Sequence, residues 1–240
     1  MSKTIKPYKL DTSKKDQVKE MFNKISKRYD ILNHTLSLGM DHIWRKKAIK
    51  MITNNPKEIL DIATGTADFA LSAAKYTNAK ITGIDIAENM INIGNKKIKK
   101  RKLNKRIKLS IADSENLPFN DLSFDAITAG FGIRNFENLE KGLYEIYRVT
   151  KKNGMVVILE PSIPNKFPLK QLFSLYFNHI LPFIGRIVSN DTNAYTYLPN
   201  SVKEFPNGNK FTTILEKIGF KRTKYFPLSY GIVSLYVAIK

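Results

Sequence analysis

The clearest pattern in the chain is an alternation, from residue 57 onward, between short apolar runs and stretches with apolar residues at helical spacing. The runs are rich in isoleucine and valine, which is typical of strands buried on both faces of a parallel sheet. The sequence therefore predicts one sheet of seven strands, of which the sixth is the weakest. They are expected at Glu58–Ile62, Lys80–Ile84, Ile107–Ile111, Phe124–Ala129, Met155–Leu159, Lys221–Phe226 and Val233–Ile239.

Between the strands, four stretches have the three- and four-residue apolar spacing of amphipathic helices that cover a sheet. The last two strands are separated only by residues 227–232, too few for a crossover helix, so this pair must be antiparallel. A nucleotide-binding sheet that ends in an antiparallel hairpin is the arrangement of class I methyltransferases, whereas ordinary dehydrogenases lack it. The predicted helices are Ala67–Lys75, Asn89–Lys100, Leu139–Val149 and Lys210–Ile218.

Two segments lie outside this alternation. Residues 12–52 have the pattern of two helices around a turn at Leu38-Gly39, and residues 161–207 form an insertion that contains six prolines. Segments that do not build a sheet often carry substrate recognition. We therefore expect a helical extension over residues 1–52 and a Rossmann-like α/β domain over residues 53–240, in which the insertion caps the substrate.

The composition narrows the class of protein. With 240 residues, 42% hydrophobic and 25% charged, the chain suits one globular domain with extensions. No apolar run approaches the roughly 18 residues of a membrane span, and the first twenty residues have no apolar signal core, so a cytoplasmic location is expected. Cysteine is absent and the three histidines have unrelated spacings, which argues against disulfides, thiolate chemistry and a metal site.

The formal net charge of +19 raises the question of a polyanionic partner. The densest basic stretch, residues 96–108, falls where a helix should end and a strand begin, and lysine is abundant along the whole chain. A solvated face produced by compositional bias is the favoured interpretation. An RNA-binding patch is the alternative, and no nucleic-acid partner is expected.

The segment from Asp61 to Asp68 carries the most specific chemical signal, because a buried strand runs directly into a turn of small residues and then a helix. Gly65 and its small neighbours let a ligand approach the backbone. In a dinucleotide-binding protein this turn would read G-x-G-x-x-G and meet a pyrophosphate. Here Asp61 ends the strand, and its negative charge suits a cationic sulfonium cofactor better than a diphosphate.

Two more acids end the next two strands. Asp85 is placed to accept hydrogen bonds from both hydroxyls of a ribose, and Asp113 from the exocyclic amine of adenine, while Ser114 would line the ring. The carboxyl ends of parallel strands share one edge of the sheet, so the three acids should converge on one crevice. For each acid alone, capping of the following helix is the alternative.

The motifs resemble those of the UbiE/MenG family of quinone-ring C-methyltransferases over nearly the whole chain after residue 18. Tyr29–Asn33 with Leu36-Ser37 and Trp44 is similar to the first family signature, and Phe131–Asn135 matches the F-G-x-R-N element. Residues 148–162 resemble the second signature. The segment from Tyr195 to Pro206 is again similar.

The sequence departs from the family pattern in several places. Ala63 and Ala67 stand in the turn where many members carry glycine, and we expect a small cost because both residues are small. Asp41 stands where the first signature has histidine, so an acid–base role assigned to that position does not transfer unchanged. Thr150, Lys152 and Asn153 replace more usual residues of the second signature.

The resemblance implies S-adenosyl-L-methionine as the cofactor and a prenylated hydroquinone as the acceptor. It places cofactor contacts on Thr66, Asp85, Asp113 and Ser114, with Asp61 and Gly65 shaping the pocket. The implied reaction is C-methylation of demethylmenaquinol to menaquinol. A ubiquinone-precursor step, and a class I methyltransferase acting on RNA or another small molecule, stay open as alternatives.

Carbon methylation of a hydroquinone needs its hydroxyl to lose a proton, and therefore a base or a group that stabilises the phenolate. Arg134 and Asn135 follow the fourth strand directly and are the main catalytic candidates. The alternative for Arg134 is a structural ion pair with Asp30 or Glu160. Weaker candidates for acid–base work are Asp41, Glu160 and Tyr195.

The insertion is rich in large apolar residues from Phe167 to Ile187, with Lys166, Lys170 and Arg186 at its margins. This composition would suit a prenyl tail and peripheral contact with an anionic membrane, and packing against the domain explains it equally well. A homodimer is also left open. A basic binding protein that has lost catalysis is disfavoured, because all three strand-end acids are present.

Overall fold

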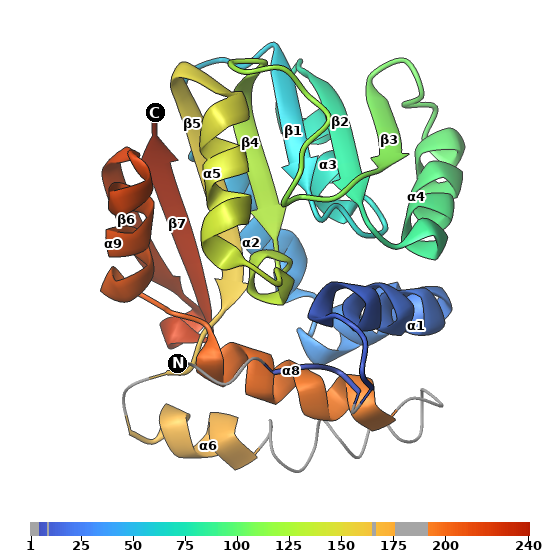
Figure 1. Ribbon diagram of the computed structural model, residues 1–240, viewed down its shortest axis with the longest axis vertical. Helices are drawn as coiled ribbons and strands as arrows, with labels where there is room; N and C mark the ends of the chain where they lie inside the picture. Colours follow the sequence, from blue (N-terminus) through green and yellow to red (C-terminus); the bar gives the residue numbers. More distant parts are fainter. Residues whose placement is uncertain (1–4, 9, 165–166, 176–191) are drawn as a thin grey trace.

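The computed structural model describes residues 5–8, 10–164, 167–175 and 192–240 (Figure 1). Within these residues, seven strands form one sheet in the order β3-β2-β1-β4-β5-β7-β6, with β7 antiparallel to both of its neighbours. The predicted class I methyltransferase fold with its antiparallel ending is therefore confirmed. The strands are β1 (Glu58–Ile62), β2 (Lys80–Asp85), β3 (Ile107–Ile111), β4 (Phe124–Gly130), β5 (Thr150–Pro161), β6 (Lys221–Leu228) and β7 (Val233–Ile239).

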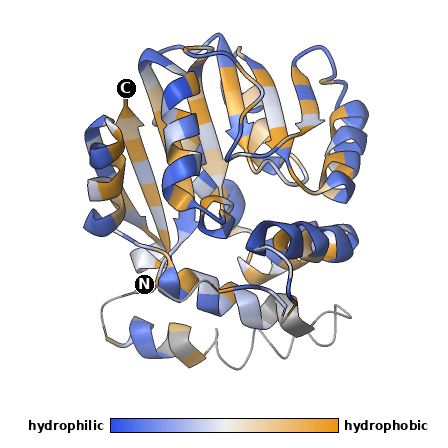
Figure 2. Cartoon of the chain, in the orientation of Figure 1, coloured by the Kyte–Doolittle hydropathy of each residue, from blue (hydrophilic) through white to orange (hydrophobic). Residues whose placement is uncertain are grey.

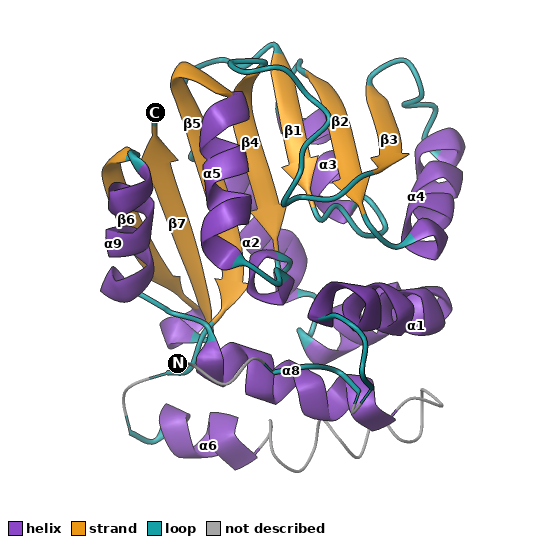
Figure 3. Ribbon diagram, in the orientation of Figure 1, coloured by secondary structure: helices purple, strands orange, loops and turns teal. Residues whose placement is uncertain are grey.

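Helices lie on both faces of the sheet and along one edge (Figure 3). The 3-10 turns η1 (Ile133–Asn135) and η3 (Ser229–Gly231) follow β4 and β6. The helices are α1 (Lys14–Leu36), α2 (Met40–Lys50), α3 (Asp68–Tyr76), α4 (Glu88–Lys100), α5 (Leu139–Val149), α6 (Leu169–Leu175), α8 (Thr192–Glu204) and α9 (Asn209–Ile218). The bounds of α5 agree with the sequence prediction, and those of α3, α4 and α9 differ from it by one residue at one or both ends.

Two apolar layers hold the sheet, one on each face. Successive strand residues such as Ile59 and Leu60 point into different layers, as the two-residue period of a strand requires. Residues of α2 and α3 pack in one layer, and residues of α5 and α9 pack in the other. Figure 2 accordingly shows hydrophobic residues concentrated on the strands and hydrophilic residues on the outer surfaces of α4 and α5.

Strand β5 is longer than predicted at both ends. Its register against β4 shifts between Phe124 and Ala126, so the polar residues after Thr150 form an irregularity that hides the start of the strand. At the other end, Glu160 and Pro161 still pair with β7. The extra residues matter because Glu160 is thereby carried to the carboxyl edge of the sheet.

The two N-terminal helices have different positions. Trp44, Ala48 and Ile49 of α2 are buried in the core layer that contains α3. Helix α1 begins where the Ser13 hydroxyl accepts the Asp16 amide, and together with α8 it lies across the carboxyl edge of the strands (Figure 1). The division of the chain at residue 52 stays a prediction.

Within the described residues, every helix is too short or too polar to span a membrane. The part of the insertion that the structure describes is helical, in α6 and α8. Lys166 and the predicted apolar stretch from residue 176 to Ile187, with Arg186, lie outside the described residues.

The apolar stripe of α5 gives a direct test of the packing. Leu143 is fully buried against the sheet, whereas its neighbour Tyr144 is 53% exposed. We expect Leu143→Ala to lower the free energy of unfolding by about 2–5 kcal/mol, because it leaves a cavity in a close-packed layer. Tyr144→Ala is the control and should change it by less than about 1 kcal/mol. Urea denaturation measures both, and equal effects would contradict the assigned packing.

Candidate functional site

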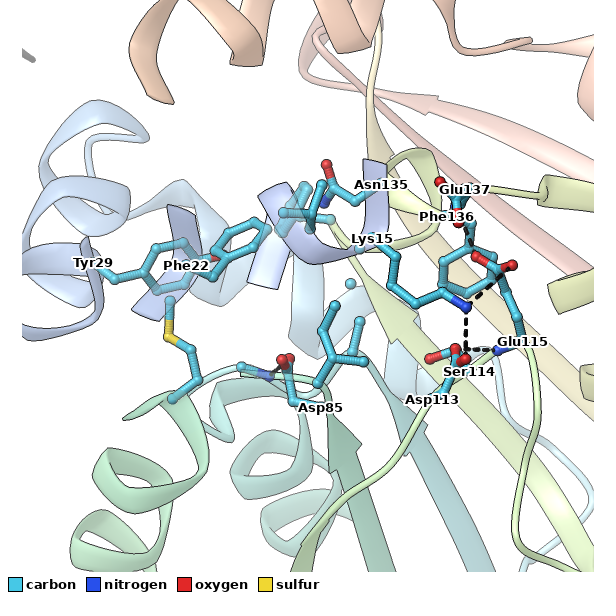
Figure 4. Close-up of a pocket in the computed structure, with 18 residues that line it drawn as sticks. Lys15, Phe22, Tyr29, Asp85, Asp113, Ser114, Glu115, Asn135, Phe136 and Glu137 are labelled. Carbon is cyan, nitrogen blue, oxygen red and sulfur yellow. Dashed lines mark hydrogen bonds and ion pairs between the residues drawn. The ribbon is translucent and has the colours of Figure 1, made fainter. Parts of the chain in front are cut away.

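A pocket lies at the carboxyl ends of β1, β2 and β3. Backbone and side chains of the strand ends form its floor, and α1 forms a wall. Figure 4 shows Asp85 and Asp113 on the strand side of this pocket, with Phe22 and Tyr29 of α1 across from them. Asp85 and Asp113 therefore line one pocket, as the sequence predicts for the acids at the strand ends.

The third acid, Asp61, is fully buried under the turn rather than in the pocket lining. Its two carboxylate oxygens accept the hydroxyls of Thr64, at 2.5 Å, and Thr128, at 2.6 Å. Burial raises the pKa of Asp61 to about 6, although these hydrogen bonds oppose the shift. Asp61 thus shapes the turn after β1, and its direct contact with a cofactor stays a prediction.

The turn after β1 is joined to the end of β2. Asp85 accepts the Gly65 amide at 2.8 Å through one carboxylate oxygen and the Ala87 amide at 2.9 Å through the other. Burial raises the pKa of Asp85 above its usual value, and the hydrogen bonds from these two amides only partly oppose this shift. Gly65 has a φ of +54°, and a side chain there would meet nothing nearer than the Tyr29 ring at 3.9 Å, so the backbone lies open to the pocket.

The alanines of this turn are more costly than expected. Ala63 has a φ of +50° and Ala67 a φ of +70°. For a residue with a Cβ, this left-handed region costs about 1–2 kcal/mol. The expectation of a small cost is therefore wrong, because it considered side-chain size and not backbone conformation. Glycine adopts this conformation without the penalty, so it suits both positions.

Asp113 and Ser114 lie at the other end of the pocket. One Asp113 oxygen accepts the Glu115 amide at 2.9 Å, and the other accepts Lys15 of α1 at 2.7 Å. Glu115 is buried and accepts the Glu137 amide at 2.7 Å. These contacts place a lysine of the N-terminal helix directly over the predicted adenine position (Figure 4).

Thr66, a predicted cofactor contact, is buried outside the pocket lining. Its hydroxyl donates to Asp30 of α1 and accepts a hydrogen bond from Lys97 at 3.2 Å. Lys97 also forms an ion pair with Asp30 at 2.9 Å and with Asp68. This cluster holds α1 against α3 and α4, and the cofactor contact of Thr66 stays a prediction.

A second, larger pocket with a cavity volume of about 410 Å³ adjoins the first. The two share four lining residues, Phe22, Tyr29, Phe131 and Asn135. Most other residues of the second pocket are apolar and come from α1, α2, α6, α8 and the end of β5. They include Met21, Ile25, Leu32, Trp44, Phe173 and Leu198.

Arg134 lines this second pocket and is paired with Glu160. The distance from Nη1 to the carboxylate is 3.0 Å, and the same guanidinium nitrogen donates to the Phe131 carbonyl. Glu160 is fully buried, which raises its pKa although Arg134 lowers it, and it also accepts the Ile133 amide at 2.7 Å. Of the two structural partners considered from sequence, Glu160 is the one that pairs with Arg134.

One donor of Arg134 has no partner. Its Nε is buried and makes no hydrogen bond within the described residues. Such a group costs about 1–3 kcal/mol when it stays unsatisfied, so the protein holds this guanidinium in place at a cost in stability.

Asn135 lies between the two pockets. Its side-chain oxygen accepts the hydroxyl of Tyr197 at 3.1 Å, and Tyr197 is buried in the cluster that joins α8 to α1. The insertion is thereby fixed to the loop after β4. The side chain of Tyr195, a weaker candidate from sequence, lies outside the described residues.

Asp41 lines the second pocket and is almost completely buried. It pairs with Arg45 and accepts hydrogen bonds from Ser37 and His34, both at 2.8 Å. Burial alone would raise the pKa of Asp41, but the Arg45 charge and these hydrogen bonds outweigh it and lower the pKa. An ionised carboxylate held in this way is a poor general base near neutral pH.

Sequence reasoning missed three of the four residues that α1 contributes to the first pocket. Lys15, Val18 and Phe22 are far from the strand ends in sequence, and no local motif marks them. The helical spacing of Val18 and Phe22 was the one signal present, and it indicates only a buried helix face.

Comparisons with known proteins show the family of this chain. The model of the ubiE/COQ5 methyltransferase family matches residues 10–240. The chain is 46% identical to demethylmenaquinone methyltransferase of Bacteroides fragilis, covering 98% of this chain and 97% of the relative. It is 44% identical to the ubiquinone/menaquinone biosynthesis C-methyltransferase UbiE of Geotalea daltonii, covering 95% and 98%.

Solved structures support the fold alone, because the sequence identities are low. An S-adenosyl-L-methionine-dependent methyltransferase of Methanococcus maripaludis, described as putative, has a TM-score of 0.65 at 21% identity, with 92% of this chain and 93% of that chain covered. One from Aquifex aeolicus has a TM-score of 0.60 at 18% identity, covering 83% and 91%. On the full-length family match and the high identity of its relatives, the chain belongs to the ubiE/COQ5 methyltransferase family.

Proposed function

We propose that this chain transfers a methyl group from S-adenosyl-L-methionine to a ring carbon of a prenylated hydroquinone, with demethylmenaquinol as the acceptor. The observation that carries the proposal is the adjacency of the two pockets, which share Phe131 and Asn135. Methyl transfer from a sulfonium is an in-line displacement, so donor and acceptor must lie side by side. The relatives named for menaquinone synthesis favour the naphthoquinol.

The first pocket fits S-adenosyl-L-methionine. Each Asp85 oxygen accepts one backbone amide and keeps a lone pair for a ribose hydroxyl. The open backbone at Gly65 leaves room for the methionine part, and Ser114 lies where the adenine ring is expected. When bound, the cofactor supplies an electrophilic methyl group on a sulfonium.

The second pocket fits an apolar acceptor with a tail. Its cavity volume of about 410 Å³ lies within the roughly 300–1000 Å³ typical of small-molecule sites. Apolar side chains of α1, α6 and α8 would surround the prenyl chain, while Arg134 and Asn135 mark the polar end next to the first pocket. The quinol ring belongs at that end.

Arg134 is the residue that we assign to phenolate stabilisation. Its guanidinium lines the pocket, where it would meet a ring oxygen, and Glu160 and the Phe131 carbonyl fix it in place. A donor that is oriented before the reaction stabilises developing charge without reorganisation. Asn135, held by Tyr197, would orient the acceptor from the other side.

The acceptor is tested by methyl transfer from radiolabelled cofactor to a naphthoquinol and a benzoquinol in parallel. We expect label in the naphthoquinol at a kcat/KM at least about tenfold above that for the benzoquinol. Preferential labelling of the benzoquinol would favour the ubiquinone-precursor step. Labelling of neither, with RNA labelled instead, would refute the proposal.

The cofactor site is tested by Asp85→Ala. We expect the affinity for S-adenosyl-L-methionine to fall by about a hundredfold or more, because two hydrogen bonds to a carboxylate are lost. Asp125→Ala is a matched control, since Asp125 also accepts two backbone amides, those of Lys57 and Glu58, at the opposite edge of the sheet. Calorimetric titration measures both variants, and an unchanged affinity of Asp85→Ala would refute the assignment.

The role of Arg134 is tested by Arg134→Ala. We expect cofactor affinity to be kept and the single-turnover rate at saturating cofactor to fall by about a hundredfold to a thousandfold, the usual loss when an oriented donor is removed. A wild-type rate would remove Arg134 from the mechanism.

Glu160→Gln is the control for this test. It breaks the same ion pair but leaves the guanidinium in the pocket. If the single-turnover rate depends on Arg134 itself, Glu160→Gln should retain a much larger fraction of the wild-type rate than Arg134→Ala retains. Equal losses in the two variants would mean that the ion pair acts through structure alone.

A further inference from the structure

The corner between α1 and α2 carries three exposed, large apolar side chains. Leu38 is 88% exposed, Ile31 is 66% exposed and Ile43 is 62% exposed. The stacked rings of His34 and His42, with centroids 4.5 Å apart, hold the end of α1 against the start of α2. The three apolar residues therefore belong to one corner of the molecule.

Leu38 is unusual in its backbone as well as its exposure. Its φ is +51°, in the left-handed region that costs a leucine about 1–2 kcal/mol and that glycine or asparagine tolerates. Neither stability nor solubility favours an exposed leucine at such a position. Backbone strain is often kept at functional positions, and at Leu38 it coincides with the exposed apolar corner.

The same residue connects the corner to the larger pocket. Leu38 lines this pocket with Leu36 and Met40, so the corner forms part of its mouth. A molecule that covered the corner would also cover the opening through which an apolar ligand reaches the pocket.

Basic side chains surround the apolar tip. On α2 the exposed positions are His42, Ile43, Lys46, Lys47 and Lys50. On α1, Lys27 is exposed and precedes Ile31 by one helical turn. The nearby acids do not offset this charge, because Asp30 is paired with Lys97 and Asp41 is buried with Arg45.

We propose that this corner, formed by Ile31, Leu38 and Ile43 and flanked by Lys27, Lys46, Lys47 and Lys50, docks on the surface of an anionic lipid membrane. Apolar side chains that enter the interface beside lysines that meet anionic headgroups are the usual means of peripheral binding. The inference rests on the proposed function in that a prenylated acceptor would enter the pocket from the lipid. Charge complementarity favours lipid over a second copy of this chain, which carries the same net charge of +19.

The test is co-sedimentation of the full chain with vesicles that contain no quinol, made of phosphatidylcholine alone or with about one quarter phosphatidylglycerol. We expect binding to the anionic vesicles, weakened by salt, and little binding to the neutral ones. Leu38→Asn should weaken binding by about tenfold, since it removes one inserted leucine. Its melting temperature should not fall, because asparagine tolerates the left-handed backbone.

Leu122→Asn is the matched control. Leu122 is also an exposed leucine at positive φ, +55°, but it precedes β4 at the opposite edge of the sheet. The Leu122→Asn variant should bind the anionic vesicles as tightly as the wild-type chain does. Equal weakening by the two substitutions would overturn the proposal, and so would a wild-type chain that ignores anionic vesicles or that forms a dimer which Leu38→Asn dissociates.

The charges are tested by the double variant Lys47→Glu and Lys50→Glu. It should lose at least about tenfold in vesicle binding, whereas Lys99→Glu with Lys100→Glu, the same charge change at the far end of α4, should lose much less. Equal loss would indicate non-specific attraction by net charge and would overturn the assigned surface. In the double variant Lys47→Glu and Lys50→Glu, methyl transfer to a short-tailed, water-soluble quinol should be unchanged. This assay separates a failure of membrane docking from a failure of the proposed reaction.

Discussion

The hydrogen bond from the Gly65 amide to the Asp85 carboxylate is the contact on which the site depends. It joins the turn after β1 to the end of β2, and Asp61 supports the same turn from below through two threonine hydroxyls. Both carboxylates are buried, so each would be costly without these partners. Their fixed positions hold the backbone of Gly65 open to a ligand, even though Ala63 and Ala67 hold left-handed conformations that cost energy.

Local patterns were sufficient to predict the sheet. The bounds of β1 and β3 agree with the prediction because each strand is a short apolar run ended by a polar residue or a turn. β5 was predicted too short, since polar residues after Thr150 break the apolar run while the backbone continues to pair. The antiparallel ending followed from the length of one connection, which chain geometry alone restricts.

The site was predictable only where its residues follow strands. Asp85 and Asp113 were found because the carboxyl ends of parallel strands must share an edge. The contacts of α1 could not be found in this way: Lys15 meets Asp113, and Asp30 meets Thr66, across long separations that no spacing rule connects. The turn sequence likewise does not indicate that the Thr66 hydroxyl bonds to another helix, and the cofactor contact that the family resemblance implies for Thr66 stays a prediction.

The distribution of charge decides what kind of acid–base chemistry the acceptor pocket can support. Among its described lining residues the one carboxylate is Asp41, whose lowered pKa and bound partners make it a poor proton acceptor. Arg134 cannot accept a proton either, because a guanidinium stays charged. The acceptor pocket is therefore suited to stabilising a phenolate rather than to abstracting its proton. Because Glu160 offsets the net charge of Arg134, this stabilisation would come from hydrogen bonds that the guanidinium donates to a ring oxygen, with the proton passing to water at the open mouth.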